Sequence, residues 1–116
     1  MHILFIVNDA PYGTERMFNA LRMAGTLVRA ESNRVTVFLM GDAVSGAKAG
    51  QKTPDGYYNI ERMLRRVITG KGAVLLCGTC LDARGINDAE MLAGSRRSTL
   101  EELCEATTVA DKVLVF

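Results

Sequence analysis

The feature that most constrains the fold is a series of short, predominantly apolar runs, of which the first three are followed by turns. Four such runs occur: HILFIV at 2–7, RVTVFLM at 34–40, AVLLC at 73–77 and KVLVF at 112–116. Nearly unbroken apolar runs rich in branched residues are typical of strands buried on both faces of a parallel sheet. Because helical patterns alternate with these runs, the sequence predicts an α/β fold with a mainly parallel sheet of four or five strands.

Helical spacing of apolar residues connects these runs. The first helix is expected between 14 and 30, with Thr14 as its N-cap. Its buried stripe comprises Met17, Leu21, Ala24 and Val28. A second stripe, ended by Gly70, comprises Ile60, Met63, Leu64, Val67 and Ile68. The pattern therefore predicts helices on both faces of the sheet.

The remaining segments predict shorter elements. Residues 41–50 suit a short helix, and the breaker-rich stretch QKTPDGYYN at 51–59 suits an exposed loop. Asn87 with Glu90, and Ser98 with Glu101, have the three-residue spacing that starts a helix. The last helix is expected to bury Leu100, Leu103 and Cys104.

Composition limits the class of protein. The 116 residues suit one domain, 1–116, with 48% hydrophobic and 23% charged residues, as in ordinary soluble proteins. A formal net charge of +1 does not indicate the strongly basic surface that binds nucleic acid. No run reaches membrane-spanning length, and the first apolar run is too short for a secretory signal. An odd cysteine count, three, favours a reducing compartment, and we expect a cytoplasmic protein with no nucleic-acid or membrane partner.

Three loops follow predicted strands: NDAPYGT at 8–14, the Gly41–Asp42 turn and CGTC at 77–80. Parallel strands joined by right-handed crossovers bring these loops to one edge of the sheet, where α/β proteins bind ligands. Asn8, Asp9 and Tyr12 are therefore candidate binding residues, although Asn8 and Asp9 are also common turn formers.

The CGTC turn carries the strongest chemical signal. Cys77 ends an apolar run and can serve as a small buried hydrophobe. Cys80 lies in the turn with Gly78 and Thr79, near Arg84, before an expected helix start. Backbone N–H groups and a cationic side chain favour a thiolate, so Cys80 is the candidate reactive residue.

Other chemistries fit the sequence less well. A structural zinc needs four ligands and one CxxC supplies two, while the single histidine, His2, lies at the far end of its strand. The sequence therefore predicts no metal site and no Cys–His pair. The first loop has neither a GxGxxG nor a P-loop pattern, so no cofactor is expected. A thioredoxin-like dithiol of Cys77 and Cys80 remains open, although no proline obviously introduces a strand.

Several motifs together resemble the DsrE/DsrF-like family, which includes sulfur-relay proteins related to TusD and small YchN-like proteins. They are NDAPYG after the first strand, GDAV with GQKTPDGYYN in the middle, CGTCLDARGI after the third strand, and STLEELCEATTVADKVLVF. The resemblance covers nearly the whole chain. It implies a three-layer α/β/α fold, a flavodoxin-like arrangement and assembly into homotrimers or homohexamers.

In the sulfur-relay members a loop cysteine accepts a persulfide sulfur and passes it on, and by position that cysteine corresponds to Cys80. Backbone N–H groups around Gly78–Leu81, and Arg84, would stabilise the anion. Arg84 could instead pair with Asp82 or Asp88. Cys77 could resolve a persulfide or be purely structural.

Three hypotheses follow. The first is a cytoplasmic sulfur carrier or sulfurtransferase-like homo-oligomer acting through Cys80, with a sulfur-donor or acceptor protein as partner. The second is a non-catalytic module that binds a small ligand or serves assembly, and the third is a CxxC redox protein. Tyr57 and Tyr58 could cover the cysteine or lie at a subunit interface.

Overall fold

The computed structural model describes residues 1–116 and contains one five-stranded sheet. Its strands are β1 (His2–Val7), β2 (Arg34–Leu39), β3 (Ala73–Cys77), β4 (Ser95–Ser98) and β5 (Lys112–Val115). They are ordered β4-β3-β2-β1-β5, and every neighbouring pair is parallel. The predicted parallel α/β fold is confirmed.

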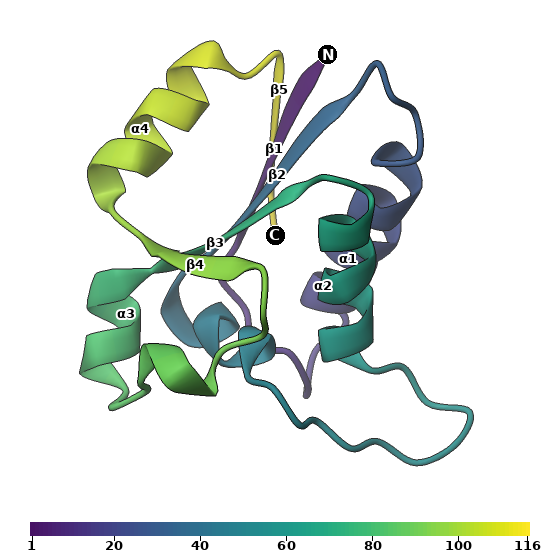
Figure 1. The fold of residues 1–116 in the computed structure, drawn as a ribbon, viewed down its shortest axis with the longest axis vertical. Coiled ribbons are helices and arrows are strands. Elements are labelled where there is room, and N and C mark those ends of the chain that lie inside the picture. The colour runs from purple at the N-terminus through teal and green to yellow at the C-terminus, as the bar shows by residue number, and fades with distance from the viewer.

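Helices cover both faces of this sheet (Figure 1). Helices α1 (Arg16–Leu27) and α2 (Ile60–Thr69) and the 3₁₀ helix η1 (Gly41–Ala47) lie on one face, and α4 (Leu100–Val109) lies on the other. The chain advances from β1 to β3 through α1 and α2, then returns through α4 to pair β5 with β1. When all crossovers have the same handedness, a connection that runs one way along the sheet places its helix on one face. A connection that runs the other way places its helix on the opposite face.

The two faces bury very different amounts of apolar side chain. The core under α1, α2 and η1 contains 21 buried residues, whereas the cluster under α4 contains four: Leu4, Phe38, Leu75 and Leu103. The stripe predicted on α2 is confirmed, since Ile60, Leu64 and Val67 are fully buried and the helix ends at Gly70. No helix of the chain has both the length and the apolar character needed to cross a membrane.

Helix starts differ from prediction at two places. Helix α1 has Glu15 as N-cap, and the Thr14 hydroxyl donates to Asp9 instead. Helix α4 is capped by Thr99, whose hydroxyl oxygen accepts the N–H of Glu102, so the Ser98 prediction was wrong.

The buried face of α4 also differs from the prediction. Leu103 faces the sheet, and Ala106 and Ala110 pack against the same small cluster. Leu103 is buried as predicted, but Leu100 is 63% exposed and Cys104 is also exposed. The expected burial of Leu100 and Cys104 was therefore wrong.

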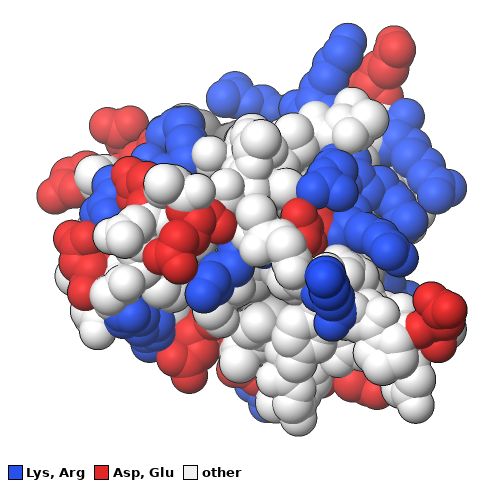
Figure 2. Space-filling view, turned by 60° about the horizontal axis from the view of Figure 1, so that its bottom comes forward, with Lys and Arg blue, Asp and Glu red and all other residues white.

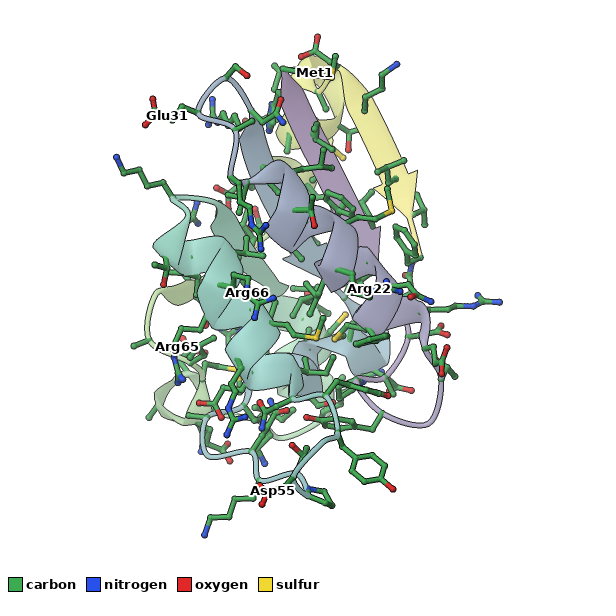
Figure 3. All side chains as sticks on the ribbon, turned by 90° about the vertical axis from the view of Figure 1, so that its right-hand side faces the viewer. Met1, Arg22, Glu31, Asp55, Arg65 and Arg66 are labelled. Carbon is green, nitrogen blue, oxygen red and sulfur yellow. The ribbon has the colours of Figure 1, made fainter.

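Two other segments differ in type or detail. Asn87 and Glu90 form the predicted reciprocal cap, but the helix that it begins is the single 3₁₀ turn η2 (Asp88–Glu90). The chain then enters β4, a polar edge strand beside β3. The 51–59 loop is mostly exposed as expected, and it projects away from the sheet with Asp55 at its tip (Figure 3).

Candidate functional site

Cys80 is the third residue of α3 (Gly78–Ala83), the short helix that follows β3. Its side chain is partly buried, and its Sγ accepts a hydrogen bond from the backbone N–H of Gly41 at 3.2 Å. Gly41 begins η1, directly after β2. The loops after β2 and β3 therefore meet at the thiol, as their common position at the carboxyl edge predicts.

The backbone conformation at position 41 favours glycine. Its φ is +58°, in the left-handed region, and a Cβ there would stand 3.3 Å from the carbonyl oxygen of Asn8. This backbone conformation turns the chain at the end of β2 and directs the Gly41 N–H to the sulfur. The sequence indicated a turn here, but nothing in its spacing indicated contact with Cys80.

Arg84 joins the two loops on either side of the thiol. Its Nε and Nη2 donate to Asp42 Oδ1 at 3.0 and 2.8 Å, and its Nη1 donates to the Cys80 carbonyl at 3.1 Å. The predicted ion pair with Asp82 or Asp88 was wrong. No hydrogen bond connects the guanidinium with the Cys80 sulfur, and the contacts position the backbone of Cys80 against η1.

Arg97 of β4 is a central residue of the site that the sequence reasoning missed. It pairs with Asp82 at 2.9 Å and Asp88 at 3.0 Å, and its Nη1 donates to the Gly78 carbonyl at 3.1 Å. Hydrogen bonding to Arg97, reinforced by its charge, lowers the pKa of Asp82 below its ordinary value. A Cβ on Gly78 would stand 2.8 Å from Arg97 Nη1, so the glycine makes room for this contact.

Cys77 is the last residue of β3 and the N-cap of α3, and it packs against both core clusters. Burial raises the pKa of the Cys77 thiol above its ordinary value, and the neighbouring Cys80 thiol raises it further. Cys77 therefore remains a neutral thiol at neutral pH. All three cysteines are free, including the exposed Cys104 of α4.

The residues predicted in the first loop already have partners within the chain. Asn8 Nδ2 donates to the Phe116 carbonyl at 3.2 Å, and Asp9 accepts from Thr14 at 3.2 Å. The Tyr12 hydroxyl donates to Gln51 Oε1 at 2.5 Å. These contacts give all three residues a structural role, and none of them is a contact with Cys80. A substrate contact of Asn8, Asp9 or Tyr12 stays a prediction.

The aromatic residues near the middle loop pack against one another. Tyr58 stacks on Tyr12 with 5.8 Å between ring centroids and packs on Phe18 at 4.4 Å. Tyr57 is 71% exposed. Thr79, next to Cys80, is exposed and makes no hydrogen bond through its side chain.

The charged side chains around this edge are of both signs (Figure 2). Acidic and basic side chains are interspersed at the left of that view. Asp42, Asp82 and Asp88 each pair with an arginine near the thiol. No group of three or more His, Cys, Asp or Glu side chains converges to hold a metal ion. His2 lies at the start of β1 and bonds to Thr36 at 3.2 Å, at the opposite edge from Cys80.

Comparisons with known proteins match this chain over its full length. The model of the DsrE/DsrF-like family matches residues 1–116. Protein YchN of Escherichia coli is 45% identical over 115 residues, which cover 98% of this chain and 97% of YchN. The uncharacterized protein MJ0989 of Methanocaldococcus jannaschii is 33% identical over 116 residues, with both chains covered completely.

Solved structures give the same result. The crystal structure of E. coli YchN superposes with a TM-score of 0.93 at 44% identity, over 99% of this chain and 98% of that one. A protein of unknown function from Methanobacterium thermoautotrophicum, MTH1491, shares the fold with a TM-score of 0.78 at 13% identity, over 99% and 98% of the two chains. The chain belongs to the DsrE/DsrF-like family.

Proposed function

We propose that this protein is a sulfur carrier that accepts a sulfane sulfur on Cys80 and passes it to a partner thiol. The observation that carries the proposal is the position of the Cys80 sulfur, which receives the Gly41 N–H at 3.2 Å beside the neutral thiol of Cys77. Membership of a family associated with sulfur relay supports the same assignment.

The proposed reaction consists of two thiol exchanges. The Cys80 thiolate attacks the outer sulfur of a donor persulfide, a new S–S bond forms, and the donor's own S–S bond breaks to release a thiolate. An acceptor thiolate then attacks the outer sulfur on Cys80 and regenerates the free cysteine. Each step conserves electrons and requires no external oxidant or reductant.

The surroundings of Cys80 suit a sulfur anion. A backbone N–H is a fixed dipole that stabilises a thiolate or persulfide without moving during the reaction. Arg84 acts indirectly, because its guanidinium binds Asp42 and the Cys80 carbonyl and so keeps α3 against η1. The partial exposure of Cys80 gives a donor access to the sulfur.

The dithiol alternative is less well supported. A CxxC redox protein cycles between a disulfide and two thiols, so Cys77 would have to form a bond with Cys80 and be released again. Cys77 packs against both core clusters, and burial raises its pKa, so it is not the attacking thiol. We therefore assign Cys77 a structural role next to the sulfur-carrying residue.

We also propose that the protein forms a homotrimer or homohexamer. Edge strand β5 has an unpaired side and exposes Val113 (39%) and Val115 (64%), and α4 exposes Leu100 (63%) and Val109 (64%). Unpaired edges and exposed apolar side chains favour association with another copy. Light scattering should give the mass of three or six chains, and the mass of one chain would overturn this part of the proposal.

Mass spectrometry of intact protein tests the carrier function. The reduced protein is incubated with a sulfane-sulfur donor, desalted and weighed, then weighed again after an acceptor thiol is added. Wild type, Cys77→Ser and Cys104→Ser should each gain one sulfur atom and lose it to the acceptor, and Cys80→Ser should gain none.

Two outcomes would overturn the proposal. Loss of the increment in both Cys77→Ser and Cys80→Ser, with a mass decrease of two hydrogens in wild type, would assign dithiol redox chemistry. No increment in any folded variant would favour a non-catalytic binding module. Circular dichroism of each variant establishes that it is folded.

A further inference from the structure

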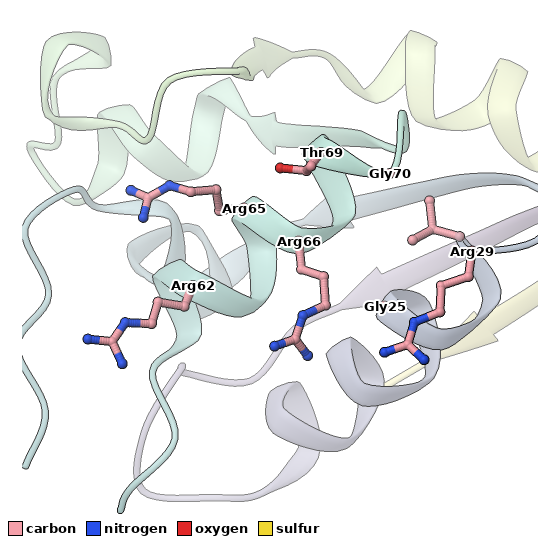
Figure 4. A pocket seen from close by; sticks show the side chains of 8 residues that line it. Gly25, Arg29, Arg62, Arg65, Arg66, Thr69 and Gly70 are labelled. Carbon is pink, nitrogen blue, oxygen red and sulfur yellow. The ribbon is translucent and has the colours of Figure 1, made fainter. Parts of the chain in front are cut away.

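Four arginines line a shallow pocket of about 430 Å³ between α1 and α2 (Figure 4). Arg62, Arg65 and Arg66 project from α2, and Arg29 follows the end of α1. Thr69 and Gly70 complete its wall, and Val28 is its one hydrophobic side chain. In Figure 1 these two helices lie on the right, and α3 with Cys80 lies at the lower left, so this arginine pocket is separate from the proposed sulfur site.

The charges of the arginine pocket are mostly unpaired. Arg65 binds Glu61 at 2.8 Å, but the guanidinium groups of Arg29, Arg62 and Arg66 have no carboxylate oxygen within 4.0 Å and donate no hydrogen bond. The whole chain has a formal net charge of only +1. Lys and Arg gather at the right of Figure 2, over the side of the molecule formed by α1 and α2, with few carboxylates among them.

This concentration of charge opposes folding. Arg62 and Arg66 stand four residues apart on α2, and like charges at this spacing destabilise a helix. Attraction to the helix dipole compensates only for Arg66, which lies in the last turn, because the effect fades beyond that turn. Helix stability therefore does not explain why an arginine stands at position 62, or why Arg29, which follows the neighbouring helix, lies in the same pocket.

Close helix packing holds part of the pocket in shape. A Cβ on Gly70 would stand 2.7 Å from Val28 Cγ1, so glycine at this position lets the two helices approach each other. A Cβ on Gly25 would stand 3.4 Å from Arg66 Cδ, and the stem of Arg66 thus lies across α1 at a residue without a side chain. Figure 3 shows Arg65 and Arg66 on the outer side of α2, with Arg22 on α1 nearby.

We propose that the arginine pocket binds a small molecule that carries several phosphate groups. Guanidinium groups present paired N–H donors that match phosphate oxygens, and three unpaired guanidiniums from two elements require a ligand with more than one anionic group. The volume lies in the range of small-molecule sites, and Val28 is the one hydrophobic residue among the eight that line the pocket. This activity goes beyond sulfur transfer and does not depend on Cys80.

Isothermal titration calorimetry with inorganic tripolyphosphate tests the proposal at low and at physiological salt. Wild type should bind one tripolyphosphate per pocket, more weakly as salt increases. Arg66→Gln should weaken binding about tenfold, the usual effect of losing a charge-assisted hydrogen bond. Arg62→Gln with Arg66→Gln should abolish it.

A matched control removes the same charge elsewhere. Arg34 and Lys112 are exposed and also unpaired, and neither lines the arginine pocket. The double variant Arg34→Gln, Lys112→Gln should bind tripolyphosphate as wild type does, and so should Cys80→Ser.

Three results would overturn the proposal. One is the absence of saturable binding at low salt. Another is equal weakening by both double variants, which would indicate only diffuse charge attraction. The third is pocket-dependent binding of a glutamate-rich peptide without binding of tripolyphosphate, which would assign the arginine pocket to an acidic protein partner.

Discussion

The corner around Cys80 and the arginine pocket use the same side chain in opposite ways. Around Cys80, Arg84 and Arg97 bind three aspartates and two backbone carbonyls and fix α3 between η1 and β4. In the pocket, three of the four arginines have no partner within the chain. Arginines whose N–H donors are bonded within the chain stabilise the fold, whereas arginines whose donors have no partner can still bind a ligand.

Glycine substitutions should give the largest difference between the two regions. Gly41→Ala places a side chain at φ +58° and 3.3 Å from the Asn8 carbonyl, so it should lower the free energy of unfolding by about 1–2 kcal/mol. Gly25→Ala, inside α1, meets only an ordinary contact at 3.4 Å and should raise it by about 0.5–1 kcal/mol. Urea unfolding of both variants measures the two changes, and equal shifts would refute the contrast.

The next largest effect should come from acid, which weakens ion pairs such as Arg96–Glu102 and Arg97–Asp82. Hydrogen bonds from Arg96 and then Ser98 lower the pKa of Glu102 from 4.5 to about 2. A carboxylate with a depressed pKa in the folded state stabilises the protein fully above its unfolded pKa, and this stability is lost as pH falls from about 4.5 towards 2. The lowered pKa of Asp82 beside Arg97 acts in the same direction.

Urea midpoints measured across this acid range test the prediction. Glu102→Gln should flatten the pH dependence of the urea midpoint, and Arg66→Gln should leave it unchanged, because no carboxylate pairs with Arg66. A wild-type midpoint that does not fall with acid would contradict the assignment of these ion pairs.

The smallest effect should come from the arginine pocket itself. Arg62→Gln with Arg66→Gln relieves a like-charge pair on α2 and should raise the free energy of unfolding by about 0.2–0.5 kcal/mol at low salt. The gain should vanish at high salt because salt screens exposed charges. Destabilisation by this double variant would show that the arginines serve the fold.

The main framework was predictable from the sequence because it depends on local patterns. The four apolar runs became β1, β2, β3 and β5, and the α2 stripe is buried as expected. Strand β4, with the sequence SRRS, has no apolar signal, since it lies at an edge and pairs only with β3. Its place in the sheet depends on hydrogen bonds to β3 and on the ion pairs of Arg97, which no local pattern encodes.

The candidate site was predictable only in part. The position of the CxxC turn after a strand located Cys80 at the carboxyl edge, but its partners are distant in sequence. Gly41 contacts Cys80 across 39 positions, and Asp42 contacts Arg84 across 42. For α4, the sequence has two adjacent candidate caps, Ser98 and Thr99, and both residue types suit the position.

The most direct test of the account locates the transferred sulfur within the chain. After exposure to a sulfane-sulfur donor, the protein is alkylated and digested with trypsin, which releases Cys77 and Cys80 in residues 72–84 and Cys104 in residues 98–112. Fragmentation of the first peptide should place the extra sulfur on Cys80, with Cys77 and Cys104 alkylated as simple thiols. Extra sulfur on the exposed Cys104, or on Cys77 in place of Cys80, would contradict the central claim.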